Sequence, residues 1–96
     1  MTTLSTSEID AAVKTLDGWT FKENAFRKQF TFAGFPEAVA FVGRLVADCE
    51  AADHHPDITI NYRRVTLSWS THSEGGVTEK DVAGARMAER HVRGQA

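Results

Sequence analysis

The chain has little cysteine and no excess of positive charge. Its single cysteine, Cys49, has no partner within the chain, which excludes an internal disulfide framework. Eleven basic residues against thirteen acidic ones give a formal net charge of −2, whereas nucleic-acid-binding proteins usually carry a basic surplus, so direct DNA or RNA binding is disfavoured. No stretch approaches the roughly 20 apolar residues that span a bilayer, and the first residues lack the pattern of a secretory signal. We therefore expect a cytoplasmic protein without a membrane partner.

The composition is otherwise that of an ordinary folded protein. Hydrophobic residues make up 42% and charged residues 25% of the 96 residues, which argues against intrinsic disorder. No internal repeat or low-complexity tract divides the chain, so we expect one domain over residues 1–96. Because a domain this small buries a modest core, self-association would add stability, and we expect a homo-oligomer.

Apolar residues at helical spacing predict three helices. Ser5 precedes Glu8 by three positions, as in a capping box, and apolar residues follow at i, i+3, i+4 and i+7. Pro36 fits the first turn of a second helix, where its missing N–H costs nothing, and a long apolar stripe comes after it. Thr78 is positioned to cap a third helix that runs through Arg93.

Alternating apolar and polar residues predict four strands, over residues 19–22, 26–32, 58–62 and 65–70. The order helix-strand-strand-helix-strand-strand-helix is typical of an α+β fold, here a four-stranded antiparallel sheet with helices packed on one face. We expect the second hairpin to have one apolar face. The same alternation places His72 on the polar side, where the last strand ends, so its ring should be accessible.

Three of the four histidines, His54, His55 and His72, lie in the predicted connectors. Imidazole titrates near neutral pH and both gives and takes a proton, so such residues suit general acid-base catalysis. The simpler interpretation is three solvated surface side chains. A metal site is disfavoured because adjacent side chains in an extended segment point in opposite directions, and no cysteine pair or metal-binding helix motif supplies further ligands.

The other candidates near these histidines have simple structural interpretations. Glu50 and Asp57 flank the histidine pair, and they either orient imidazoles or are solvated carboxylates. Asp81 lies near the start of the third predicted helix and would complement the helix dipole. Cys49 lies on an apolar stripe and is most simply a small core residue rather than a nucleophile.

Two segments together carry a specific signature. Residues 50–57 hold His-His-Pro between acidic residues, and residues 70–81 hold Thr-His-x-x-Gly-Gly-x-Thr. With Leu-Asp-Gly-Trp at 16–19, they make the chain resemble the pterin-4a-carbinolamine dehydratase family from about residue 4 to about residue 88. Relatives often carry an aromatic residue after the His-His-Pro stretch, Asn with a basic residue at the second hairpin turn, and an acid at position 73. This chain has Ile58-Thr59-Ile60, Arg63-Arg64 and Ser73 there, and every proposed proton carrier is retained.

The resemblance implies a fold, an assembly and a reaction. The fold is the same α+β arrangement, assembled as dimers or tetramers. The reaction removes water from the 4a-hydroxytetrahydropterin that aromatic amino acid hydroxylases leave, and yields quinonoid dihydropterin for recycling, with no metal or organic cofactor. Because hydroxide is a poor leaving group, an acid must protonate the 4a oxygen while the N5 proton is lost to a base or to water.

The resemblance also implies which residues carry this chemistry. His54 and His72 would be the acid-base pair, and His55 would mainly hold the pterin. The substrate would contact these three and Asp53, Ser70, Thr71 and Ser73, with Glu50, Pro56 and Asp81 in supporting roles. We expect folding to bring the three imidazoles around one small cleft.

Two other functions stay open at this point. Relatives in animals also act as a dimerisation cofactor for a homeodomain transcription factor, which makes an interaction protein the main alternative. The other is a pterin-binding protein of a different pathway, such as molybdopterin metabolism. Retention of all three histidines favours catalysis, because a binding module would not need them.

Overall fold

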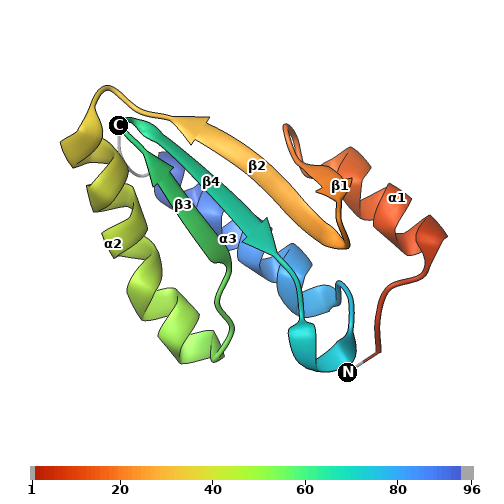
Figure 1. Cartoon of the computed structure of the whole chain (residues 1–96). Coiled ribbons are helices and arrows are strands. Elements are labelled where there is room, and N and C mark those ends of the chain that lie inside the picture. Colours follow the sequence, from red (N-terminus) through yellow and green to blue (C-terminus); the bar gives the residue numbers. More distant parts are fainter. Residues whose placement is uncertain (1, 94–96) are drawn as a thin grey trace.

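The computed structural model describes residues 2–93 and contains the predicted helices and strands in the predicted order. The elements are shown in Figure 1: α1 (Thr6–Thr15), β1 (Thr20–Lys22), β2 (Ala25–Thr31), α2 (Phe35–Ala52), β3 (Asp57–Asn61), β4 (Arg64–Trp69), the short 3₁₀ turn η1 (His72–Glu74) and α3 (Glu79–Arg93). The sequence did not predict η1.

The strands form one antiparallel sheet in the spatial order β1-β2-β4-β3, with helices packed against one face (Figure 1). The predicted fold class is therefore confirmed. The sheet order, which the sequence did not predict, places β4 next to the edge strand β3, and Asp57 at the start of β3 pairs with Ser68 near the end of β4. The connector before β3 and the segment after β4 consequently meet at the same end of the sheet.

The core lies between the sheet and α2 and α3, and its largest members alternate along the two central strands. The buried side chains of this layer include Phe26, Phe30, Val65, Leu67, Trp69, Phe41 and Leu45. Because neighbouring residues of a strand point to opposite faces, the alternate positions on β2 and β4, including Arg27 and Ser68, lie on the other face. We call this helix-free surface the open face.

The helix starts follow the sequence signals. Ser5 Oγ accepts a hydrogen bond from the backbone N–H of Glu8 at 3.2 Å, and the Glu8 carboxylate accepts one from the N–H of Ser5 at 2.8 Å, which completes a capping box. These hydrogen bonds favour the ionised carboxylate and lower the pKa of Glu8. Pro36 occupies the first turn of α2, as predicted.

Two details of the hairpins differ from the prediction. Tyr62, expected at the end of the third strand, lies in the turn with a φ of 57° and an exposed side chain. Ile58 and Ile60 lie on the helix-facing side of β3, yet 40% and 39% of their surface is exposed, because β3 is the edge strand and α2 does not cover it. The second hairpin therefore has the predicted apolar face, but only the apolar residues of β4 are buried.

Candidate active site

The end of α2 sets the position of the first histidine. Asp53 ends the helix in the left-handed conformation, with a φ of 51°. Its backbone N–H bonds the carbonyl of Glu50 at 3.2 Å, and the N–H of His54 bonds the carbonyl of Cys49 at 3.1 Å. These bonds satisfy the last carbonyls of the helix. They turn the chain so that the His54 ring packs beside the Trp69 ring, with 5.5 Å between the ring centroids.

A buried carboxylate joins the two segments that carry the predicted histidines. Asp81 Oδ1 accepts a hydrogen bond from His54 Nε2 at 2.6 Å, and Oδ2 accepts from the Thr71 hydroxyl at 2.7 Å and from the backbone N–H of Thr78 at 2.8 Å. The Asp81 side chain is fully buried and that of His54 is 11% exposed. A buried carboxylate needs such partners, because burying an unpaired charge is very costly.

This arrangement corrects two expectations. His54 is not a solvated surface histidine, and Asp81 does more than complement the dipole of α3. Because an ionised carboxylate can only accept, Nε2 of His54 carries the hydrogen of this bond. In the neutral ring, Nδ1 is then the nitrogen that can take up a proton.

His55 points to a different partner, as expected for adjacent residues of an extended segment. Its Nε2 bonds Glu50 Oε2 at 2.5 Å, and both side chains are more than half exposed. His55 and Pro56 border a cavity of about 90 Å³ beside α2, together with apolar residues such as Val46 and Ile58. The contact with Glu50 agrees with the interpretation of that carboxylate as an orienting group.

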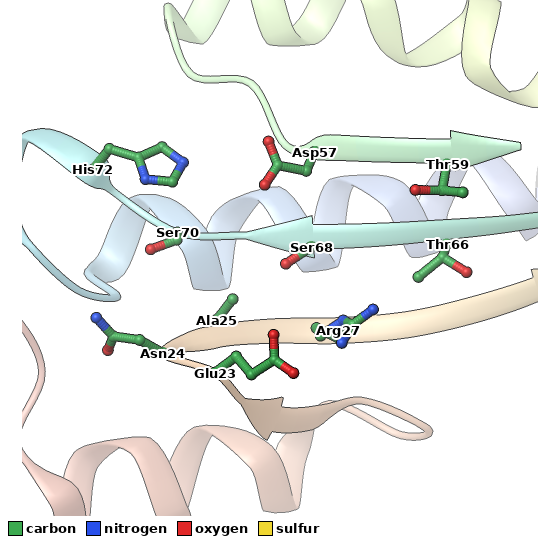
Figure 2. Close-up of a pocket in the computed structure, with 10 residues that line it drawn as sticks. All are labelled: Glu23, Asn24, Ala25, Arg27, Asp57, Thr59, Thr66, Ser68, Ser70 and His72. Carbon is green, nitrogen blue, oxygen red and sulfur yellow. The ribbon is translucent and has the colours of Figure 1, made fainter.

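His72 begins η1 and is exposed, as the strand alternation predicted. Its ring borders a hollow of about 400 Å³ that continues over Ser70 and Ser68 onto the open face. Figure 2 shows the ring and the Asp57 carboxylate extending toward each other across this hollow. Within the described residues, the ring has no hydrogen-bond or ion-pair partner.

The three rings thus border three different cavities of the chain, not one shared cleft. His54 lies at a cavity of about 430 Å³ between α2 and α3, separate from those of His55 and His72. The segments that carry His54 and His72 are joined at the end of the sheet, because Asp81 bonds both His54 and Thr71, the residue before His72. Asp57, two residues after His55, lines the hollow of His72.

The remaining predicted site residues gather at the same end of the molecule. Asp53 is exposed at the end of α2, and Ser73 is exposed within η1. Ser70 lines the hollow of His72. Thr71 is buried, and because its own hydrogen goes to Asp81, its oxygen accepts the hydroxyl hydrogen of Thr78 at 2.9 Å.

Sequence reasoning missed Asn24 in the turn between β1 and β2. Its φ is 61°, and its side-chain amide donates a hydrogen bond to the carbonyl of Gly75 at 2.8 Å. Gly75 follows η1 directly, so the hairpin tip is tied to the loop that carries His72. Asn next to a tight turn signals the positive φ, but nothing in the local sequence signals a bond across 51 positions.

A metal site and a cysteine nucleophile are the two remaining candidates that the sequence raised. No group of three histidine, cysteine, aspartate or glutamate side chains in this range could hold a metal ion. Cys49 is buried, and burial raises the pKa of its thiol, with a further contribution from Asp48 and Glu50. The raised pKa disfavours the thiolate, which makes Cys49 a poor nucleophile. None of the described helices is long and apolar enough to cross a membrane.

Comparison with known proteins decides the family. The family model described as pterin 4 alpha carbinolamine dehydratase matches residues 2–91. The chain belongs to this family. Similar proteins named as pterin-4-alpha-carbinolamine dehydratases include one from Roseiflexus sp. (strain RS-1), 50% identical over 80 residues, which are 83% of this chain and 86% of the relative. Another, from Mycolicibacterium vanbaalenii, is 44% identical over 86 residues, 90% of this chain and 92% of the relative.

A solved structure agrees with this assignment. The crystal structure described as a transcriptional coactivator/pterin dehydratase from Brucella melitensis matches with a TM-score of 0.89 at 36% identity, over 93% of this chain and 97% of that one. The resemblance inferred from the His-His-Pro and Thr-His-x-x-Gly-Gly motifs is therefore confirmed at the level of the dehydratase family.

Proposed function

We propose that this protein is a hydro-lyase that dehydrates 4a-hydroxytetrahydropterins to quinonoid dihydropterin and water. Membership of the pterin-4-alpha-carbinolamine dehydratase family supports the reaction. The observation that carries the proposal is the buried Asp81, which bonds His54 of one connector and the residue before His72 in the other. A carboxylate placed in this way holds the two segments that carry the proposed catalytic histidines in a fixed relation at one end of the sheet.

The proposed chemistry divides between two imidazoles. The C4a–O bond breaks as the hydroxyl oxygen takes a proton and leaves as water, and the proton on N5 goes to a base. The pterin would lie across this end of the sheet, between the cavity that His54 borders and the hollow that His72 borders. There His54, with Nε2 held by Asp81, would exchange protons through Nδ1, and the exposed ring of His72 would serve the other end of the reaction. His55, oriented by Glu50, mainly holds the pterin.

The other predicted residues would bind or support the pterin. Asp53, Ser70 and Ser73 lie in the two segments that meet at this end of the sheet and would line the pterin site. Thr71 would support it through its bond to Asp81. Pro56 restricts His55 to extended conformations and so limits where that ring can point.

The test is the loss of the carbinolamine, followed spectroscopically with purified protein. We expect His54→Ala and His72→Ala each to lower the rate by about 10²-fold or more, the usual size of an acid-base contribution. His91→Ala is the matched control, because this fourth histidine pairs with Asp48 instead. No acceleration over buffer, or full activity in the variant that lacks both His54 and His72, contradicts the proposal.

We further infer a homodimer or homotetramer in the cytoplasm that serves tetrahydropterin recycling. Val46 on α2 is 55% exposed and borders the same cavity as the exposed Ile58, and Ile60 is also exposed on β3. The free edge of β3 offers unpaired backbone groups to a second copy. The unpaired Cys49 fits a reducing compartment. Light scattering should give a dimer or tetramer mass that Ile60→Lys reduces and Asn61→Lys does not; a monomeric wild-type protein contradicts the assembly.

The Brucella melitensis structure is described as a transcriptional coactivator as well as a pterin dehydratase. An interaction role is therefore the second candidate function. A protein partner whose capture survives replacement of His54, His55 and His72 would favour that role. Loss of capture with the same replacements would count against it.

A further inference from the structure

Trp69 ends β4 beside the ring of His54, and packing rather than hydrogen bonding sets its place. The residue is 1% exposed, and the two ring centroids lie 5.5 Å apart with 30° between the ring planes. Among residues 2–93, the buried indole N–H at Nε1 has no hydrogen-bond partner. A buried donor without a partner is destabilising, so hydrogen bonding alone would favour an apolar side chain such as phenylalanine at this position.

The helix α3 packs closely on the same indole. At Gly84, an added Cβ would come within 2.6 Å of two carbons in the six-membered ring of Trp69. The absence of a side chain at Gly84 therefore lets the backbone of α3 approach the indole. Both residues line the cavity of about 430 Å³ that His54 borders. The indole is consequently packed against both α3 and the histidine ring.

The His54 ring has a second restraint of a different kind. Its Nε2 donates to Asp81 Oδ1 at 2.6 Å, and this bond determines which ring nitrogen carries the hydrogen. One hydrogen bond restrains the tilt of the ring plane only weakly, because carboxylate oxygens accept over a broad range of directions. An aromatic face restrains that tilt, since aromatic rings attract each other at centroid distances of about 4.5–7 Å. The direction of Nδ1 therefore depends on the contact with Trp69.

We propose that Trp69 is a positioning residue for the dehydration: its indole supports the His54 ring and sets the direction in which Nδ1 exchanges protons. The inference rests on the proposed dehydratase function, in which Nδ1 takes up a proton. Asp81 then selects the tautomer of the ring, and Trp69 selects its orientation. A ring held in this way before the substrate binds is already aligned for proton transfer.

The first test is proton NMR of the His54 ring, which needs no turnover. The ring current of a neighbouring indole moves the protons over its face upfield, so in wild type the carbon-bound ring protons of His54 should resonate upfield of those of the exposed His72. Trp69→Phe should keep part of this shift and Trp69→Leu should abolish it. The ring nitrogen shifts should still place the hydrogen on Nε2 in both variants, because Asp81 is unchanged. An absent upfield shift in wild type, or a changed tautomer in Trp69→Leu, overturns the proposal.

The second test measures kcat and KM for the carbinolamine at a temperature below all Tm values. We expect Trp69→Leu to lower kcat by about 10- to 100-fold, the effect of a misdirected reacting group, with little change in KM. Trp69→Phe keeps an aromatic face and removes the unpaired N–H, so its kcat should stay within about threefold of wild type. Val65→Ala is the matched control: it removes a buried side chain from the same side of β4, four residues earlier, and should lower Tm but not kcat.

The outcomes separate the positioning role from the proposed function. Wild-type kcat in Trp69→Leu, a rise in KM alone, or an equal loss of kcat in Val65→Ala refutes the positioning role while the enzyme remains a dehydratase. A wild-type protein that shows the upfield His54 shift but accelerates no dehydration refutes the proposed function itself.

Discussion

Replacing Asp81 by asparagine tests the hydrogen bonds that join the two segments of the candidate site, with almost no change in side-chain shape. Asn has the size of Asp, but one oxygen becomes an NH₂ group that donates. The remaining oxygen can still accept from Thr71 and from the Thr78 N–H, which both bond Oδ2. The NH₂ group then faces Nε2 of His54, which now has to accept. In Asp81→Asn the His54 hydrogen therefore moves to Nδ1, and the nitrogen that should take up a proton is blocked.

The expected magnitudes follow from these contacts. A hydrogen bond to a charged group contributes about 1.5–3 kcal/mol. Asp81→Asn keeps the three partners but replaces a charged group by a neutral one, so we expect it to reduce the free energy of unfolding by about 2 kcal/mol. For a domain of this size that lowers Tm by about 8–16 °C. The loss of rate should be larger, about 10²- to 10⁴-fold, because an acid-base group in the wrong tautomer contributes nothing.

The decisive assay is nitrogen NMR of the His54 ring together with the dehydration rate, at a temperature well below both Tm values. The ring nitrogen shifts distinguish the Nε2–H tautomer expected for wild type from the Nδ1–H tautomer expected for the variant. Glu79→Gln is the control, because Glu79 is an exposed carboxylate in the same first turn of α3. An unchanged tautomer, or a rate within about threefold of wild type, refutes the reasoning.

Four further predictions concern the stability of the fold and the position of the loop after η1. Gly84→Ala would place a Cβ 2.6 Å from the Trp69 ring and should cost about 1–3 kcal/mol of stability. Gly43→Ala, where nothing lies within 4 Å, should raise stability by up to about 1 kcal/mol; both follow from thermal melts. Folding lowers the pKa of Glu8, so the ionised carboxylate stabilises the folded state at neutral pH, and this stabilisation is lost as the pH falls through the lowered pKa. The Tm values of wild type and Glu8→Gln should therefore converge in acid. Asn24→Gly keeps the turn but frees the loop after η1, and should lower kcat more than it changes Tm.

The fold was predictable where the signals are local. The capping box of Ser5 and Glu8 marks the start of α1, and Pro36 marks the first turn of α2. Alternation along β4 separates buried from open-face residues correctly. The exposure of Ile58 and Ile60 was not predictable, because the pattern shows which face of a strand is apolar but not whether the strand lies at the edge of the sheet.

The candidate site was predictable in its parts but not in its connections. Alternation places His72 on the accessible face, and the extended His54-His55 step separates the two rings toward Asp81 and Glu50. The assignment of each ring to its own cavity depends on how the end of α2 docks against β4. That docking is a set of contacts between distant segments, and no local pattern encodes it.

Asp81 nevertheless carried a signal in the sequence. It stands four and seven residues before Ala85 and Ala88, on the stripe of α3 that is fully buried. A carboxylate on such a stripe has to find hydrogen-bond donors, because the unpaired charge would cost more than a small domain has in total stability. The pattern therefore predicts that Asp81 has hydrogen-bond donors, but it does not predict which residues they are. The segment after β4 supplies Thr71 and the segment after α2 supplies His54. The hydrogen bonds that a buried carboxylate requires therefore also fix the position of a proposed catalytic ring.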